Sequence, residues 1–184
     1  MLRHKVDVQI DGSFFILLVM MLLLLPLQWV VAVLVSIVIH ECFHALAIIL
    51  LSGRIFALRI GIGGMQMETD SMTPTRELIA ALAGPLGSGC LVLLAPWLPR
   101  TAICGFVHFL YNMIPLYPLD GGRILENILR LLTAEKFAVI FAWSQRLIKL
   151  ILSVMGVILC LHWGVLPAMV LIFLLLKLRG KRTV

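Results

Sequence analysis

Two histidines flank a glutamate in the segment His40-Glu41-Cys42-Phe43-His44. On a helix, side chains four residues apart lie on one face, so His40 and His44 are placed to bind one zinc ion together. Glu41 then lies beside the metal, where its carboxylate can take a proton from a metal-activated water. The residue types and their spacing therefore indicate metal-assisted hydrolysis.

The setting of this segment is apolar. From Val30 to Leu51 the only ionisable side chains besides Cys42 are the two histidines and the glutamate. An ionisable side chain at membrane depth costs on the order of 2.5 kcal/mol or more, so three of them together need a compensating partner. A bound metal ion is such a partner.

The composition is that of an integral membrane protein. Of the 184 residues, 62% are hydrophobic and 13% charged, and the mean hydropathy is +1.12. At about 20 residues per span, this length allows about six helices and no sizeable soluble domain, so residues 1–184 are expected to form one domain. The N-terminus carries no credible cleavable signal, and the first apolar run is expected to remain as a span. The four cysteines are isolated and are expected to be small buried hydrophobic residues rather than disulfides or zinc ligands.

These features predict an all-α polytopic membrane protein with about six transmembrane helices and a small membrane-associated β-sheet or hairpin. A short strand is expected at 5–11 and a hairpin at 55–69, where apolar residues alternate on either side of a glycine-rich turn. An interfacial loop without regular pairing is the alternative for 55–69. The expected spans lie approximately at 14–29, 30–51, 77–97, 101–119, 145–162 and 164–178.

Two of these segments carry further signals. In the third span, Ala80, Gly84 and Ser88 recur at four-residue spacing, which lets another helix approach closely. After the fourth span, residues 122–136 have the pattern of an amphipathic helix lying at the membrane interface.

A catalytic zinc usually has three protein ligands and one open position. Asp120 is the best third ligand, because Pro115 and Pro118 should unwind the fourth span just before it. By chain topology, this unwound end should meet His40 and His44 in the same half of the membrane. The competing acids lie in polar or interfacial segments without such a break; they are Glu68, Asp70, Glu77 and Glu126.

Two polar residues of the fourth span have alternative roles. Asn112, about two helical turns before Asp120, can donate a hydrogen bond to the oxyanion formed when water attacks a peptide carbonyl. Alternatively, its amide joins two helices. His108 lies one turn earlier on the same face, where it is either a packed helix histidine or a group that supports the zinc ligands.

The net charge of +6 does not indicate a nucleic-acid partner, because the basic residues lie at helix ends and in loops. With both termini cytoplasmic, every Lys and Arg except Arg100 falls on the inner side of the predicted topology, as the positive-inside rule requires. The charges therefore predict a multi-pass protein with cytoplasmic N- and C-termini.

The HExxH motif, followed in a later span by the pattern NxxPxxPxDGG, resembles the site-2 protease family of intramembrane zinc metalloproteases. Within that family the chain looks like the branch of the bacterial sporulation protease that processes pro-sigma-K, and it shares the AGP triplet Ala83-Gly84-Pro85. The resemblance implies one Zn²⁺ per chain, bound by His40, His44 and Asp120. It further implies that Glu41 activates water and that Asn112 holds substrate or the oxyanion.

The same resemblance implies intramembrane proteolysis in a bacterial cell membrane. The substrate would be a membrane-associated or transmembrane protein, such as a pro-sigma or anti-sigma factor, and a membrane regulatory protein is a possible partner. Two departures stand out: the chain has Ser88 where the family often has asparagine, and it carries neither a PDZ domain nor CBS domains.

Two other functions are compatible with a metal site in a membrane. A metal transporter would require polar residues on several spans, whereas the first, fifth and sixth predicted spans carry almost none. A relative that binds membrane proteins without cutting them would not need every catalytic residue, yet all of them are present.

Overall fold

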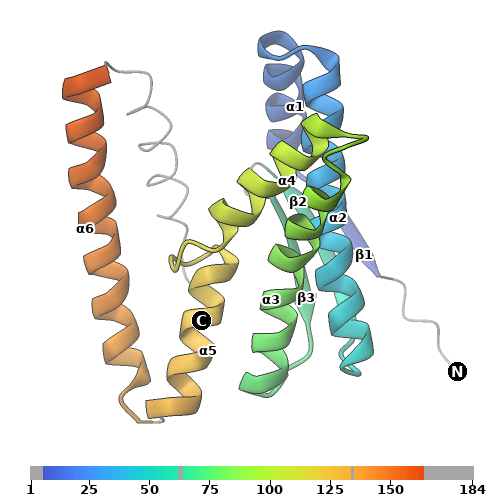
Figure 1. Cartoon of the computed structure of the whole chain (residues 1–184). Helices are drawn as coiled ribbons and strands as arrows, with labels where there is room; N and C mark the ends of the chain where they lie inside the picture. The colour runs from blue at the N-terminus through green and yellow to red at the C-terminus, as the bar shows by residue number, and fades with distance from the viewer. Residues whose placement is uncertain (1–5, 62–63, 134, 164–184) are drawn as a thin grey trace, which may run out of the picture.

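Helices form most of the chain in the computed structural model, which describes residues 6–61, 64–133 and 135–163 (Figure 1). A three-stranded sheet accompanies them, so the predicted combination of a largely helical chain and a small sheet is confirmed. The helices are α1 (Gly12–Leu24), α2 (Leu27–Leu50), α3 (Pro74–Cys90), α4 (Pro99–Asn112), α5 (Asp120–Thr133) and α6 (Phe137–Trp163); a short 3₁₀ turn, Leu91–Leu94, extends α3.

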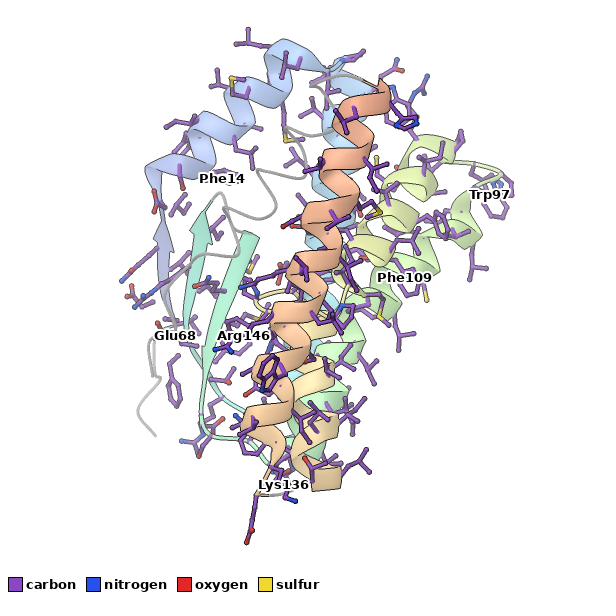
Figure 2. The ribbon with its side chains drawn as sticks, turned by 90° about the vertical axis from the view of Figure 1, so that its left-hand side faces the viewer. Phe14, Glu68, Trp97, Phe109, Lys136 and Arg146 are labelled. Atoms are coloured by element: carbon purple, nitrogen blue, oxygen red, sulfur yellow. The ribbon has the colours of Figure 1, made fainter. Side chains whose placement is uncertain are left out.

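Three stretches among the described residues are long and apolar enough to cross a membrane: Leu27–Leu50, Pro74–Leu94 and Phe137–Ile158. Six spans are therefore not established. The expected spans 14–29 and 101–119 correspond to α1 and α4, which have only 13 and 14 residues. The expected sixth span, 164–178, lies outside the described residues. Apolar side chains project outward all around the helices (Figure 2), as a lipid environment allows.

The first two helices form an antiparallel pair (Figure 1). α1 begins after Asp11, whose carboxylate accepts a hydrogen bond from the Ser13 amide at 2.8 Å and caps the helix. It ends before Pro26, because the residue before a proline is pushed out of helical geometry, and Leu25 is extended. The chain reverses there and enters α2.

The sheet has the order β1-β2-β3, formed by β1 (Asp7–Ile10), β2 (Ile55–Gly61) and β3 (Gly64–Thr69). β2 and β3 pair antiparallel as a hairpin, and β1 adds to β2 in parallel. The register aligns Ile10, Ile60 and Met65 in one row and Gln9, Arg59 and Gln66 in the next. Because successive side chains alternate, one face of the sheet is apolar and the other is polar. The outer edge of β3 has no paired strand among the described residues.

The helical chain breaks between α4 and α5. Residues 113–119 are irregular, and the Tyr117–Pro118 peptide bond is cis. The Tyr117 amide donates to Oε1 of Gln145 at 2.8 Å, and Nε2 of Gln145 donates to the Pro115 carbonyl at 3.0 Å. Irregular backbone at membrane depth needs such partners, and here a side chain from α6 supplies them.

Boundaries in the second half differ from those expected. The amphipathic helix starts at Asp120 rather than at 122 and ends at Thr133. α6 starts at Phe137 rather than at 145, because a turn that ends at Lys136 is followed directly by helix-forming apolar residues. The expectation of buried cysteines is wrong for Cys42 and Cys90, which are exposed on their helices. An apolar surface suits lipid, so a small hydrophobic residue need not be buried there.

Candidate metal centre

Three ligand atoms converge between α2 and the start of α5. Nε2 of His40 and Nε2 of His44 lie 2.9 and 3.1 Å from Oδ2 of Asp120, and the two nitrogens lie 3.1 Å apart. All three residues are buried. Among the described residues, this trio is the only group of three or more His, Cys, Asp or Glu side chains placed to hold a metal ion.

The sequence explains each position. His40 and His44 belong to a buried stripe of α2 that recurs every four residues and also contains Ala32, Ser36 and Ile48. Asp120 is the first residue of α5, aimed inward by the break before it. A Cβ at Gly121 or Gly122 would collide with the backbone of Ile114 or Tyr117, so these glycines let the start of α5 lie directly against the broken segment.

A hydrogen bond to a backbone carbonyl fixes the tautomer of His44, and the partner of His40 is compatible with the same tautomer. Nδ1 of His44 lies 2.7 Å from the Ala80 carbonyl, which only accepts, so this nitrogen carries the proton. Nδ1 of His40 lies 2.8 Å from Oγ of Ser88, which can accept in the same way. In neutral histidines the lone pairs of both Nε2 atoms then point toward the Asp120 carboxylate.

Three converging electron pairs repel one another unless a cation lies among them. Ligands about 2.1 Å from a tetrahedral zinc are about 3.4 Å apart, a few tenths of an ångström more than the separations here. The mixed nitrogen and carboxylate donors are those of a catalytic zinc site. The residues present therefore fit zinc.

The small residues of α3 lie directly behind the two imidazoles. The Ala80 carbonyl and the Ser88 hydroxyl bind their Nδ1 atoms, and between them a Cβ at Gly84 would overlap the His44 ring. The sequence indicated close helix packing at this stripe, but it did not reveal that the stripe contacts the candidate metal ligands. The signal was present, because its spacing of four matches that of His40 and His44.

Glu41 is half-buried next to this cluster, close enough for electrostatic interaction with both histidines and Asp120. Its carboxylate accepts a hydrogen bond from the Met65 backbone amide of β3. This contact joins the candidate catalytic base to the edge of the sheet. Sequence reasoning placed Glu41 beside the metal but did not anticipate its backbone partner.

The two polar residues of α4 are placed differently. The His108 ring stacks on the His40 ring, with centroids 4.4 Å apart and planes 22° apart, and its Nδ1 lies 3.2 Å from Oγ of buried Ser36. His108 is thus packed and also contacts a ligand of the centre. Asn112 is buried, and its Nδ2 donates to the His108 carbonyl at 3.1 Å. Asn112 is not one of the three converging residues.

Three of the competing acids have other partners. Glu68 pairs with Arg59 and Glu126 pairs with Arg130, each at 2.8 Å. Asp70 accepts from the Arg54 amide at 3.0 Å. Glu77 lies in the first turn of α3 and is outside the converging group.

Comparisons with known proteins agree with this geometry. The solved structure of the site-2 protease from Methanocaldococcus jannaschii matches 100% of this chain and 94% of its own, with a TM-score of 0.73 and 21% identity. The chain has the fold of a site-2 protease. The resemblance to that family, inferred from the motifs, is confirmed.

Sequence comparison adds two relatives, each 30% identical. One, from Synechocystis, is named as a zinc metalloprotease and matches over 117 residues, 55% of this chain and 31% of its own length. The other is a zinc metalloprotease of M. jannaschii, matched over 141 residues, 66% of this chain and 41% of its own. The chain thus matches less than half the length of these relatives. No protein-family model matches it.

Replacing Gly84 with alanine is expected to displace the His44 imidazole, because the added methyl overlaps the ring. Zinc affinity of the purified protein should fall about tenfold or more, measured by competition with a chelator. Gly89→Ala on the same helix is the control, since its Cβ comes no closer than 3.5 Å to the Phe109 ring. Equal affinities of the two variants would contradict this role of Gly84.

Removing the Ser88 hydroxyl with Ser88→Ala leaves Nδ1 of His40 without its partner. Loss of such a supporting hydrogen bond is expected to lower zinc affinity about tenfold to a hundredfold. Ser153→Ala is a matched control, because that hydroxyl donates only to the Lys149 carbonyl of its own helix. Wild-type zinc affinity in Ser88→Ala would show that the bond does not orient the ligand.

Proposed function

We propose that the chain is an intramembrane zinc metalloprotease that hydrolyses a peptide bond within or next to a membrane span of its substrate. One observation carries the proposal: two imidazole nitrogens and a carboxylate oxygen converge within 3.1 Å, with Glu41 beside them, and the helix that carries His40, Glu41 and His44 is apolar enough to cross a membrane. The site-2 protease fold and the two zinc metalloprotease relatives support it.

In the proposed mechanism, His40, His44 and Asp120 hold one zinc ion, which when bound supplies Lewis-acid chemistry. Glu41 takes the proton of the attacking water and passes it to the leaving amine. Its half-buried position beside the ligands suits this exchange, and the hydrogen bond from the Met65 amide orients its carboxylate. The Ala80 carbonyl and the Ser88 hydroxyl keep both imidazoles in the ligating tautomer.

Asn112 serves in this proposal as a donor to the oxyanion. A carboxamide has two N–H groups, and the hydrogen bond to the His108 carbonyl uses one of them. The second remains for the developing negative charge on the substrate carbonyl. The first bond fixes the side chain, so that it need not be ordered when the substrate binds.

A helical substrate hides its carbonyl groups in internal hydrogen bonds, so it must become extended before hydrolysis. The outer edge of β3 offers a template to which an extended segment can add as a further strand. The Met65 amide points from this edge to Glu41, so a strand added there would lie next to the catalytic base. The neighbouring β2 is already paired on both sides.

We further propose a bacterial cell membrane as the location, with both termini cytoplasmic. The distribution of Lys and Arg supports this orientation, since Arg100 alone falls on the outer side of the proposed topology. In that orientation the sheet faces the cytoplasm. Pro-sigma factors and membrane-bound anti-sigma factors are suitable test substrates.

Replacing the proposed base with Glu41→Gln is expected to abolish cleavage, because a carboxamide cannot accept the proton, while zinc content stays at one per chain. The measurement is co-expression with tagged pro-sigma and anti-sigma candidates, followed by gel detection of a shortened product. Glu126→Gln is the control, since that carboxylate pairs with Arg130 on α5. A product equally abundant with Glu41→Gln and wild type would refute the mechanism.

Strand addition is tested at Met67, two residues beyond Met65 on β3. Amide directions alternate along a strand, so the Met67 amide also points away from β2, and a proline there removes a donor from the free edge only. Met67→Pro should slow cleavage about tenfold, while zinc content stays unchanged. Met67→Leu keeps the amide and should cleave as wild type. Unimpaired cleavage by Met67→Pro would remove strand addition at this edge from the mechanism.

A further inference from the structure

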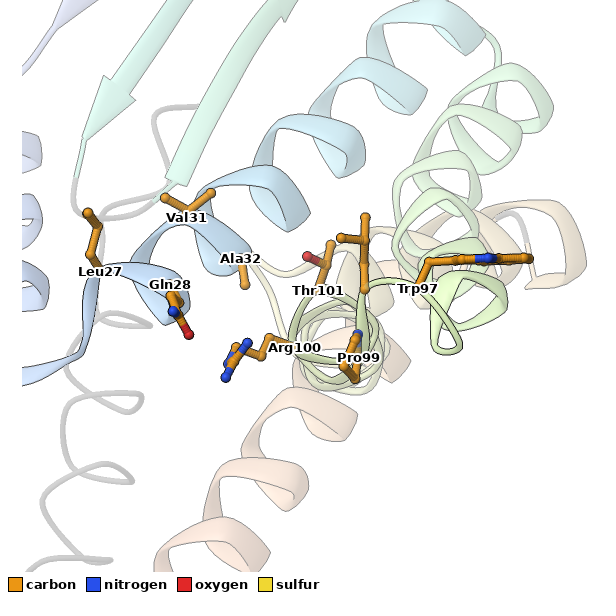
Figure 3. A pocket seen from close by; sticks show the side chains of 9 residues that line it. Leu27, Gln28, Val31, Ala32, Trp97, Pro99, Arg100 and Thr101 are labelled. Atoms are coloured by element: carbon orange, nitrogen blue, oxygen red, sulfur yellow. The ribbon is translucent and has the colours of Figure 1, made fainter.

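A cavity of about 380 Å³ opens between the first turns of α2 and α4 (Figure 3). Its α2 wall begins at Leu27 and Gln28, and Gln28 lies twelve residues before His40, about 18 Å along the helix. The cavity is therefore separate from the metal centre. We propose that it binds the headgroup phosphate of an anionic phospholipid.

The start of α4 supplies unpaired backbone donors. Leu98 precedes the helix and has no polar side-chain atom to cap it, and Pro99 has no amide hydrogen. Within the described part of the chain, the amides of Arg100 and Thr101 have no backbone acceptor; the first bond of this helix runs from Ala102 to Leu98. Such a helix end carries a partial positive charge and favours a phosphate.

The Thr101 side chain is a second, independent observation. It is only 8% exposed and lines the cavity, yet its hydroxyl has no hydrogen-bond partner among the residues that the structure describes. In Figure 3 the hydroxyl points from α4 toward the α2 side of the cavity. The hydroxyl is accessible from the cavity and has a hydrogen to donate, so it is placed for a ligand oxygen.

The charge of the cavity comes from Arg100. Its guanidinium group extends toward the tip of Gln28 in Figure 3, beside the open end of the helix. None of the nine acidic residues of the chain lines this cavity. Nothing there would bind the ammonium group of a zwitterionic headgroup, so a net-anionic headgroup is favoured.

The apolar walls indicate that the phosphate belongs to a lipid. Leu27 is 67% exposed and Trp97 is 73% exposed, and both line the cavity. Trp97 lies at the periphery of the molecule (Figure 2), the usual position of tryptophan at a membrane interface. From the cavity, acyl chains can continue along the exposed apolar faces of the helices.

The test uses the full chain purified in detergent and does not depend on proteolysis. Native mass spectrometry counts retained lipid during titration with phosphatidylglycerol, in parallel with phosphatidylcholine. Arg100→Gln removes the charge, and Thr101→Val removes only the hydroxyl. Arg146→Gln is the matched control, because that arginine is exposed on α6 and does not line the cavity.

Wild type and Arg146→Gln should each retain one phosphatidylglycerol, whereas Arg100→Gln should bind it about tenfold and Thr101→Val about fivefold more weakly. If Arg100→Gln does not fold, as judged by its thermal unfolding, Thr101→Val alone decides. Unchanged binding in the deciding variant, or equal retention of phosphatidylcholine, would overturn the proposal. Displacement of the lipid by millimolar inorganic phosphate would assign the site to free phosphate and overturn it too.

Discussion

The close approach of α2 and α3 is the constraint on which the rest of the structure depends. The His44 imidazole occupies the space that a side chain at Gly84 would need, and this proximity brings both imidazoles within reach of hydrogen-bond acceptors on α3. In water, two apolar helices are driven together by the hydrophobic effect. In lipid this force is absent, and close packing of small residues with interhelical hydrogen bonds replaces it. The same contacts thus hold the two helices together and hold the candidate metal ligands in place.

Much of the candidate site follows from the sequence because its signals are local. HExxH places two candidate ligands and a candidate base on one helix, and the prolines before Asp120 indicate where a second helix must break. The pairing of β1 with β2 and the hydrogen bond from the Met65 amide to Glu41 involve residues far apart in the chain, so no local pattern encodes them. The start of α6 was misplaced for another reason. Gln145 and Arg146 resemble the polar end of a span, whereas in the structure they lie more than two turns inside the helix.

Polar groups at membrane depth occur here in connected sets. Ser36, His108, His40 and Ser88 form one continuous line of contacts through α2, α3 and α4, which ends at the ligand atoms. Each member satisfies a neighbour that would otherwise be buried without a partner. The short Ser88 hydroxyl reaches Nδ1 of His40 at 2.8 Å.

Gln145 has a broader consequence for how the site is closed. Its carboxamide offers one acceptor and one donor to Tyr117 and Pro115, the same pair of groups that a neighbouring peptide strand would offer. Pro115 and Tyr117 lie between Asn112 and Asp120. The Gln145 side chain of α6 therefore gives this segment the hydrogen bonds that a neighbouring backbone strand would give it. α6 packs mainly against α5 and stands apart from α2 and α3 (Figure 1), so the Gln145 carboxamide is a polar link between α6 and the segment that leads to Asp120. The rate of hydrogen exchange at the Tyr117 amide would then report how often α6 separates from this segment, because Gln145 protects the amide only while α6 is in place.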